Sequence, residues 1–148
     1  KLPVVVARIF NPVGAGMKDK FLIPNLLRQI EQYKKGEVDS ITLSRLDSRR
    51  DYVAVDDIAH AFNAIIKGEP HHFAYNVGSG VSTTNGRLLD LLLSSTDLVD
   101  PKITETSAIV EPLVAIQADV SRLDSDFKWR PKVSLEKTIE EITDEQKR

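Results

Sequence analysis

Cysteine is absent from this sequence of 148 residues, which excludes a disulfide framework, a thiolate zinc site and a thiol nucleophile. Long apolar runs are absent as well, because none approaches the length that spans a membrane and no signal peptide opens the chain. Neither sign of charge dominates, since 20 Lys and Arg residues stand against 22 Asp and Glu residues. A broad electropositive surface is therefore not expected, and neither nucleic acid nor membrane is a predicted partner. We expect a soluble cytoplasmic protein.

Apolar segments of strand length alternate with segments of helical periodicity, and this alternation predicts an α/β fold with one genuine core. Expected strands are Pro3 to Phe10, Ile41 to Leu43, Arg50 to Val55, Phe73 to Val77 and Lys102 to Glu105, and expected helices are Phe21 to Lys35, Asp56 to Lys67, Thr83 to Ser94, Asp119 to Phe127 and Ser134 to Lys147. The chain opens on Lys1 and enters a strand almost at once, which we interpret as a cut edge.

Two adjacent arginines, Arg49 and Arg50, stand at the mouth of an apolar strand that turns directly into a helix. Arginine is well suited to forked binding of phosphate or carboxylate oxygens. Strand alternation places the two side chains on opposite faces, so that one can enter a pocket while the other meets water or an acidic neighbour. The alternative interpretation is that both are surface charges that blunt a strand end.

A second polar segment follows the first strand, where Asn11, Pro12 and the glycines Gly14 and Gly16 come directly after apolar residues. Ligands of open parallel sheets bind beyond the carboxyl ends of the strands, and an Asn there offers both a donor and an acceptor. The alternative is a plain exit from strand to loop, because Asn, Pro and Gly are common turn residues.

Five motifs in order resemble the C-terminal half of the extended short-chain dehydrogenase/reductase family, the NAD-dependent epimerases, dehydratases and reductases of sugar nucleotides. They are Arg8 to Gly16, Phe21 to Ile30, Leu46-Asp47-Ser48-Arg49-Arg50-Asp51-Tyr52, Tyr75-Asn76-Val77-Gly78-Ser79-Gly80, and a closing segment with Asp119 to Leu123, Trp129-Arg130-Pro131 and Ser134-Leu135-Glu136. The third motif and the Phe-Leu-Ile-Pro helix are most similar to the branch that handles GDP-linked 6-deoxy sugars. UDP-sugar 4-epimerases come second.

The resemblance implies an α/β chain that forms the last parallel strands of a Rossmann-type sheet together with a small substrate-binding domain. Residues 1–148 would be the substrate-binding portion, with residues 1–16 and 50–67 at the edge of the dinucleotide-binding sheet. It also implies a GDP- or UDP-linked sugar as ligand. A homodimer is expected for a different reason, because a cut parallel sheet leaves an unpaired strand edge and bare apolar faces. The strand Pro3 to Ile9 would then be paired across the dimer or displaced.

Site residues follow by matching the family's motifs. Asn11, Asn25, Leu26 and Arg50 would bind the substrate, with Arg50 on its diphosphate. Pro12 and Val13 would lie against the nicotinamide of NAD or NADP, most of which an upstream half would bind. Asp57 is expected to cap a helix or to pair with Arg50, and Trp129 to anchor the last helix. Gly78 and Gly80 are expected to serve a turn with positive φ.

Three family features are missing from this chain: the Gly-rich dinucleotide fingerprint, the catalytic Tyr-x-x-x-Lys, and an Arg in the segment 107–113 that closes over the second phosphate. We therefore assign no catalytic residue and expect the isolated chain to be inactive. Either Arg87 or Arg122 replaces the missing charge, or diphosphate binding is weakened. No metal site is expected, because the pair His71-His72 has no third ligand at a recognisable spacing. The alternative function is a non-catalytic module that binds a nucleotide sugar or another subunit.

Overall fold

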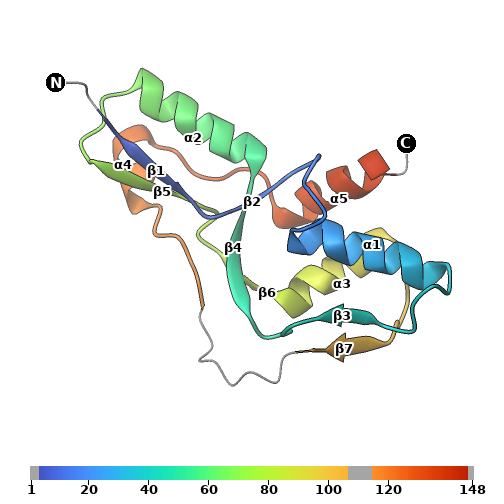
Figure 1. Cartoon of the computed structure of the whole chain (residues 1–148). Coiled ribbons are helices and arrows are strands. Elements are labelled where there is room, and N and C mark those ends of the chain that lie inside the picture. The colour runs from blue at the N-terminus through green and yellow to red at the C-terminus, as the bar shows by residue number, and fades with distance from the viewer. Residues whose placement is uncertain (1–3, 107–114, 147–148) are drawn as a thin grey trace.

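The computed structural model describes residues 4–106 and 115–146, and within them strands and helices alternate along the chain (Figure 1). The strands are β1 (Val6–Ile9), β2 (Asn11–Val13), β3 (Ile41–Leu43), β4 (Arg49–Ala54), β5 (Ala74–Val77), β6 (Ser82–Thr84) and β7 (Ile103–Glu105). The helices are α1 (Leu22–Lys34), α2 (Val55–Lys67), α3 (Asn85–Ser95), α4 (Ser121–Phe127) and α5 (Leu135–Gln146). The predicted α/β class is confirmed, and every predicted strand and helix is present with small shifts of its ends.

The strands form three small sheets in which parallel pairing predominates. β1 pairs with β5, and β3 pairs with β7, both in parallel. β4 lies between β2, which runs parallel to it, and β6, which runs antiparallel. Residues 11–13 and 52–54 thus share a sheet, whereas β1 lies in another, and membership of these segments in a dinucleotide-binding sheet stays a prediction. β1 pairs with β5 of its own chain, so pairing across a dimer stays a prediction for the other edge of β1.

β2 was not expected, because its sequence Asn-Pro-Val reads as the start of a loop. Pro12 is tolerated there since β2 is an edge strand that pairs only with β4 among the described strands. The short strand places Asn11 opposite Tyr52 in register. Pairing of two distant segments thus fixes the position of a side chain that sequence alone places in a flexible loop.

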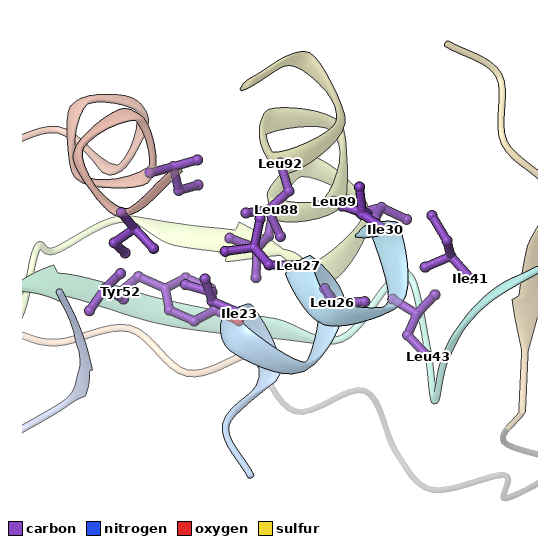
Figure 2. Packing of buried hydrophobic residues seen from close by; sticks show 13 residues of the cluster. Ile23, Leu26, Leu27, Ile30, Ile41, Leu43, Tyr52, Leu88, Leu89 and Leu92 are labelled. Atoms are coloured by element: carbon purple, nitrogen blue, oxygen red, sulfur yellow. The ribbon is translucent and has the colours of Figure 1, made fainter. Parts of the chain in front are cut away.

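β4 separates two hydrophobic cores, and Figure 1 shows α2 on one side of it with the β1–β5 pair, and α1, α3 and α5 gathered on the other. Adjacent residues of β4 enter different cores, Tyr52 one and Val53 the other, as strand alternation requires. The helical core, shown in Figure 2, comprises Val13, Ile23, Leu26, Leu27, Ile30, Ile41, Leu43, Tyr52, Leu88, Leu89, Leu92, Ile139 and Ile142. The sheet-side core comprises Val53, Ile58, Ala61, Tyr75, Val77, Leu123 and Trp129.

Trp129 was expected to anchor the last helix, and this prediction is wrong. Its side chain packs in the sheet-side core with residues of α2, α4 and β5, whereas α5 contributes Ile139 and Ile142 to the helical core. The large apolar area of a Trp makes it an anchor in either place. Which core it enters is decided by the path of the segment between α4 and α5.

Helix starts also differ in detail from the sequence predictions. The predicted helix from Thr83 begins at Asn85 as α3 and is capped by Thr84, whose Oγ1 accepts from the backbone N–H of Arg87 at 3.0 Å. α2 has no side-chain cap. Asp57, expected to be a cap or a partner of Arg50, is buried and accepts hydrogen bonds from the backbone N–H groups of Lys132 and Val133 at 3.0 and 2.9 Å. Its carboxylate therefore holds the segment that leads into α5.

Candidate functional site

A cavity of about 580 Å³ opens where the carboxyl end of β2, the strand β4 and the start of α1 meet. We call it the strand-end cavity. Its size falls within the range of small-molecule sites. Its walls combine apolar side chains with a few convergent polar groups. The lining residues that carry the argument are Asn11, Ser44, Ser48, Arg50, Tyr52 and Asn85.

Arg50 and Arg49 do face opposite sides of β4, as strand alternation predicts. Arg50 lines the strand-end cavity and is half-buried, and its guanidinium donates to the Ser48 hydroxyl at 3.2 Å and to the carbonyl of Arg49 at 2.7 Å. Arg49 is exposed and lines a different cavity, where it donates to the carbonyl of Ser82 at 3.2 Å. One arginine of the pair is thus directed toward the strand-end cavity.

Asn11 reaches the same cavity from β2. Its Nδ2 donates to the backbone carbonyl of Asp51 at 2.9 Å, so the amide is oriented by the strand that carries Arg50. A polar side chain held by a neighbouring strand loses little freedom when a ligand binds. Asn11 and Arg50 are therefore brought together, although 38 positions separate them in the sequence.

The carboxylate of Asp51 fixes this arrangement from the opposite face of β4. It is fully buried, and it accepts hydrogen bonds from Ser79 N–H and Ser79 Oγ at 2.7 Å and from the N–H groups of Gly80 and Ala118 at 2.9 Å. A buried carboxylate requires such donors. Asp51 therefore ties the strand with Arg50 to the Gly-Ser-Gly turn after β5.

Gly78 and Gly80 serve that turn for different reasons. Gly80 has a φ of +73°, as expected, which favours glycine. Gly78 does not have positive φ, so that part of the prediction is wrong. Instead, a Cβ at position 78 would lie 2.4 Å from the Cβ of Ala118 and 3.0 Å from Asp51 Oδ2. Close approach to the buried carboxylate, and not backbone conformation, requires glycine at this position.

Asn25 and Leu26 do not line the strand-end cavity. Leu26 is fully buried in the helical core, and the side chain of Asn25 accepts from Gln29 Nε2 at 2.7 Å on the surface of α1. The backbone N–H of Asn25 donates to the carbonyl of Phe21, because α1 begins at Leu22, next to its predicted start, and Asn25 ends its first turn. Leu22 and Ile23 occupy the cavity wall instead.

Pro12 and Val13, the expected nicotinamide contacts, both line the strand-end cavity. Pro12 is exposed at its rim, whereas Val13 is only 1% exposed and belongs to the helical core. A nicotinamide ring could lie against the exposed side chain of Pro12. The buried side chain of Val13 can only pack beneath the surface of the cavity. Contact of either residue with a cofactor stays a prediction.

Tyr52 and Asn85 are cavity residues that sequence reasoning did not single out. Both are nearly buried, and the Tyr52 hydroxyl donates to Asn85 Oδ1 at 3.4 Å. Burial raises the pKa of Tyr52 above its usual range, while the charge of Arg50 acts in the opposite direction. The signal for Tyr52 was present, since strand alternation puts residues 50 and 52 on one face. Asn85 gave no signal beyond its place at a helix start.

Neither arginine proposed as a replacement for the missing loop arginine lines the strand-end cavity. Arg87 pairs with Glu136 at 3.2 Å, and Arg122 donates to the carbonyl of Ala74 at 3.0 Å. The segment 107–113, where relatives place that arginine, lies outside the described residues. Arg50 is therefore the single cation among the described residues that line this cavity.

Residues 4–106 and 115–146 contain neither a cluster suited to a metal ion nor a membrane-spanning helix. No group of three or more His, Asp or Glu residues there is arranged to hold a metal ion. His71 and His72 instead lie near Asp126, whose carboxylate also accepts from the Tyr75 hydroxyl. In residues 4–106 and 115–146 no helix is both long and apolar enough to cross a membrane.

Comparison with solved structures defines the class, which is the Rossmann-type extended short-chain dehydrogenase/reductase fold. The structure of RMD from Pseudomonas aeruginosa complexed with NADPH superposes with a TM-score of 0.84 at 27% identity, covering 95% of this chain. A dTDP-glucose 4,6-dehydratase from Bacillus anthracis in complex with NAD has a TM-score of 0.83 at 20% identity. The family described as GDP-mannose 4,6 dehydratase matches residues 1–142, and the chain belongs to this family.

Curated relatives agree with this assignment. The chain is 28% identical over 142 residues to the GDP-6-deoxy-D-mannose reductase of Pseudomonas aeruginosa. It is 27% identical over 144 residues to the dTDP-4-dehydro-6-deoxyglucose reductase of Escherichia coli. These matches cover 94% and 91% of this chain but only 46% and 42% of the relatives. The chain thus spans about half the length of the curated relatives it matches.

Proposed function

We propose that this chain is the substrate-positioning half of an NAD(P)-dependent reductase, epimerase or dehydratase of nucleotide sugars, with a GDP-linked 6-deoxyhexose as the favoured substrate class. The observation that carries the proposal is the convergence of Asn11 and Arg50 on one cavity at the end of parallel strands. A relative that is 28% identical to this chain is named as a GDP-6-deoxy-D-mannose reductase.

Arg50 would bind the diphosphate through charge-assisted hydrogen bonds, because a guanidinium presents two parallel donors to phosphate oxygens. Asn11 would orient the sugar. Together they would hold the reacting carbon in place, and correct placement accounts for a large share of the rate in such reactions. The residues fit only one end of NAD(P): Pro12 offers an apolar rim to the nicotinamide, which supplies hydride chemistry when bound.

The isolated chain is expected to bind a nucleotide sugar without turning it over. It has no Gly-rich fingerprint and no Tyr-x-x-x-Lys, so it lacks the groups that hold the dinucleotide and move the proton. Cofactor-dependent turnover by the pure chain would contradict this expectation. A non-catalytic binding module is the second candidate, favoured by the same absence. The two candidates are distinguished by looking for both motifs in the parent coding sequence.

Calorimetric titration with GDP-mannose and UDP-glucose tests the site. Arg50→Ala is expected to weaken binding by about 1.5–3 kcal/mol, the range for a hydrogen bond to a charged group. Arg50→Lys should restore part of the loss, because an ammonium cannot reproduce the planar fork. Arg28→Ala is the matched control, at an exposed position of α1 outside this cavity, and should change affinity little. Equal losses at both positions would indicate general attraction, and no loss at Arg50 would reject the site.

A further inference from the structure

A second cavity, of about 640 Å³, is lined by residues of β4, β6, the start of α3 and the segment that leads into α5. We call it the basic cavity. Tyr52 contributes to the walls of both cavities, whereas Arg49 lines only the basic cavity and Arg50 only the strand-end cavity. Nothing in the proposed function uses this space, and the inference below does not depend on that function.

The charge of the basic cavity is strongly positive for a protein whose total net charge is −2. Arg49, Arg87 and Lys132 line it, with Glu136 as the one acidic residue of its walls, which leaves a net charge of +2. Within the described residues, Arg49 and Lys132 take part in no ion pair. Cations gathered around a concave surface attract a compact anion more strongly than the same cations spread over a flat one.

Arg87 is paired with Glu136 at 3.2 Å, but this pair does not remove it from consideration. Both side chains are more than half exposed, and an exposed ion pair contributes only about 0–1 kcal/mol. A phosphate group would therefore compete with Glu136 for the guanidinium at little cost, since a dianion forms the stronger forked contact.

Hydroxyl groups complete the walls, from Ser79, Ser82, Thr83, Thr84 and Ser134. Ser82 is distinctive because its Oγ is buried and has no hydrogen-bond partner in the described part of the chain. A buried polar atom without a partner costs free energy, and ligand oxygens are one way in which such an atom is satisfied. The arrangement of three cations with a ring of hydroxyls matches the chemistry of phosphoryl oxygens, which accept from both.

We propose that the basic cavity is a second binding site, separate from the strand-end cavity, for a small molecule that carries a phosphate or diphosphate group. Arg49, Arg87 and Lys132 supply charge, and Ser82 donates its hydroxyl to a phosphoryl oxygen. The two adjacent arginines of β4 thus serve two anion sites, one arginine in each cavity.

Titration of the isotope-labelled chain with inorganic phosphate and with pyrophosphate, at constant ionic strength, tests the site by NMR. Saturable shifts are expected at the backbone amides of residues 82–84, with pyrophosphate binding more tightly than phosphate because it carries more charge. Arg49→Gln and Lys132→Gln should each raise the Kd for pyrophosphate about tenfold, as for the loss of one charge-assisted hydrogen bond. Absence of saturation, or shifts confined to Asn11 and Arg50, would overturn the proposal.

Matched controls separate a defined site from general attraction. Arg28→Gln on α1 and Lys137→Gln on α5 remove the same charge from exposed positions outside the basic cavity, and each should leave the Kd within about twofold. Losses in these controls equal to those in the cavity variants would overturn the proposal. Ser82→Ala distinguishes a ligand-binding role of this hydroxyl from a structural one. The affinity for pyrophosphate should fall about threefold. The stability of the fold should stay equal or rise, because a buried unpaired hydroxyl is removed. Unchanged affinity in Ser82→Ala would reject the role of its hydroxyl.

Discussion

In the helical core, α1, α3 and α5 turn their apolar faces toward one another, whereas in the sheet-side core α2 turns only one of two apolar faces inward. Ile58 and Ala61 of α2 are buried, but Val55, Phe62 and Ile66 form a second stripe that is exposed, Ile66 by 78%. Phe73 at the start of β5 is 70% exposed, and in the described residues β1 is paired along one edge only. One region is closed within the chain, and the other presents a surface suited to a further strand and helix.

This difference explains how the strand-end cavity can be well formed in a chain that spans half the length of its relatives. The walls of that cavity come from β2, β4, α1 and α3, and these elements are anchored in the helical core. Phe10 and Pro12, which also line the cavity, follow closely after β1 of the open region. A substrate site can therefore be organised here, while the surface expected to meet the rest of an active site remains uncovered.

Asp51→Ala should have the largest effect on stability, because Asp51 joins the two regions. The substitution leaves the N–H groups of Ser79, Gly80 and Ala118 without their acceptor in a buried place. We expect a loss of about 3–5 kcal/mol in the free energy of unfolding, measured by urea denaturation. Asp47→Ala removes an exposed carboxylate paired with Arg45 and should change stability far less. Similar losses in both variants would show that the regions are not joined through Asp51.

Gly78→Ala should weaken the same junction to a smaller extent. A methyl group placed 2.4 Å from the Cβ of Ala118 must push that residue or the Asp51 carboxylate away. The expected cost is about 1–3 kcal/mol, the usual range for overpacking. Gly86→Ala is the matched control, since its nearest neighbour would be 3.5 Å away and alanine favours the helix α3. Denaturation of both variants gives the comparison, and a neutral Gly78→Ala would contradict the close packing described here.

The double variant Phe62→Ser and Ile66→Ser should leave stability nearly unchanged and reduce self-association. Both side chains lie on the outer stripe of α2, and exposed apolar patches of this kind promote association. Sedimentation velocity over a range of concentrations should show dimers or larger species for the unmodified chain and a monomer for the variant. Val99→Ser is the control in the other region, because Val99 is 87% exposed but isolated. A monomeric unmodified chain would contradict both this expectation and the predicted homodimer.

The smallest effect is expected from Tyr75→Phe, and it should depend on pH. The hydrogen bond that the Tyr75 hydroxyl donates is the main cause that keeps the pKa of Asp126 below its usual range. A hydrogen bond from the backbone N–H of His71 acts in the same direction. A lowered folded-state pKa stabilises the protein above the unfolded-state pKa of about 3.9, and that stabilisation is lost as the pH falls through the folded-state pKa. The unmodified chain should therefore exceed Tyr75→Phe in stability near neutral pH, and denaturation at decreasing pH should show the difference fading. A difference that does not vary with pH would contradict the Tyr75–Asp126 hydrogen bond as its source.

Local patterns determined the elements well, because apolar periodicity and turn residues are properties of short segments. Local patterns did not predict β2 and β6, because these short segments form strands only through pairing with β4. The predicted start of the helix α3 lay two residues before its observed start, because Ser82, Thr83 and Thr84 are equally good caps in sequence. The carboxylates of Asp51 and Asp57 looked like motif or cap residues, and their backbone donors come from residues far along the chain.

The sequence by itself determined the α/β class, the family and the opposite directions of Arg49 and Arg50, because the order of motifs and the two-residue period of a strand are written in the chain. Only the tertiary structure decided that Asn11 and Arg50 line the same cavity and that Leu26 is buried away from it. It also decided that Tyr52 lines two cavities. These outcomes depend on where α1 begins and on which strands pair with β4. Pairing and packing between distant segments are set by the burial of both cores together, and no local pattern records that requirement.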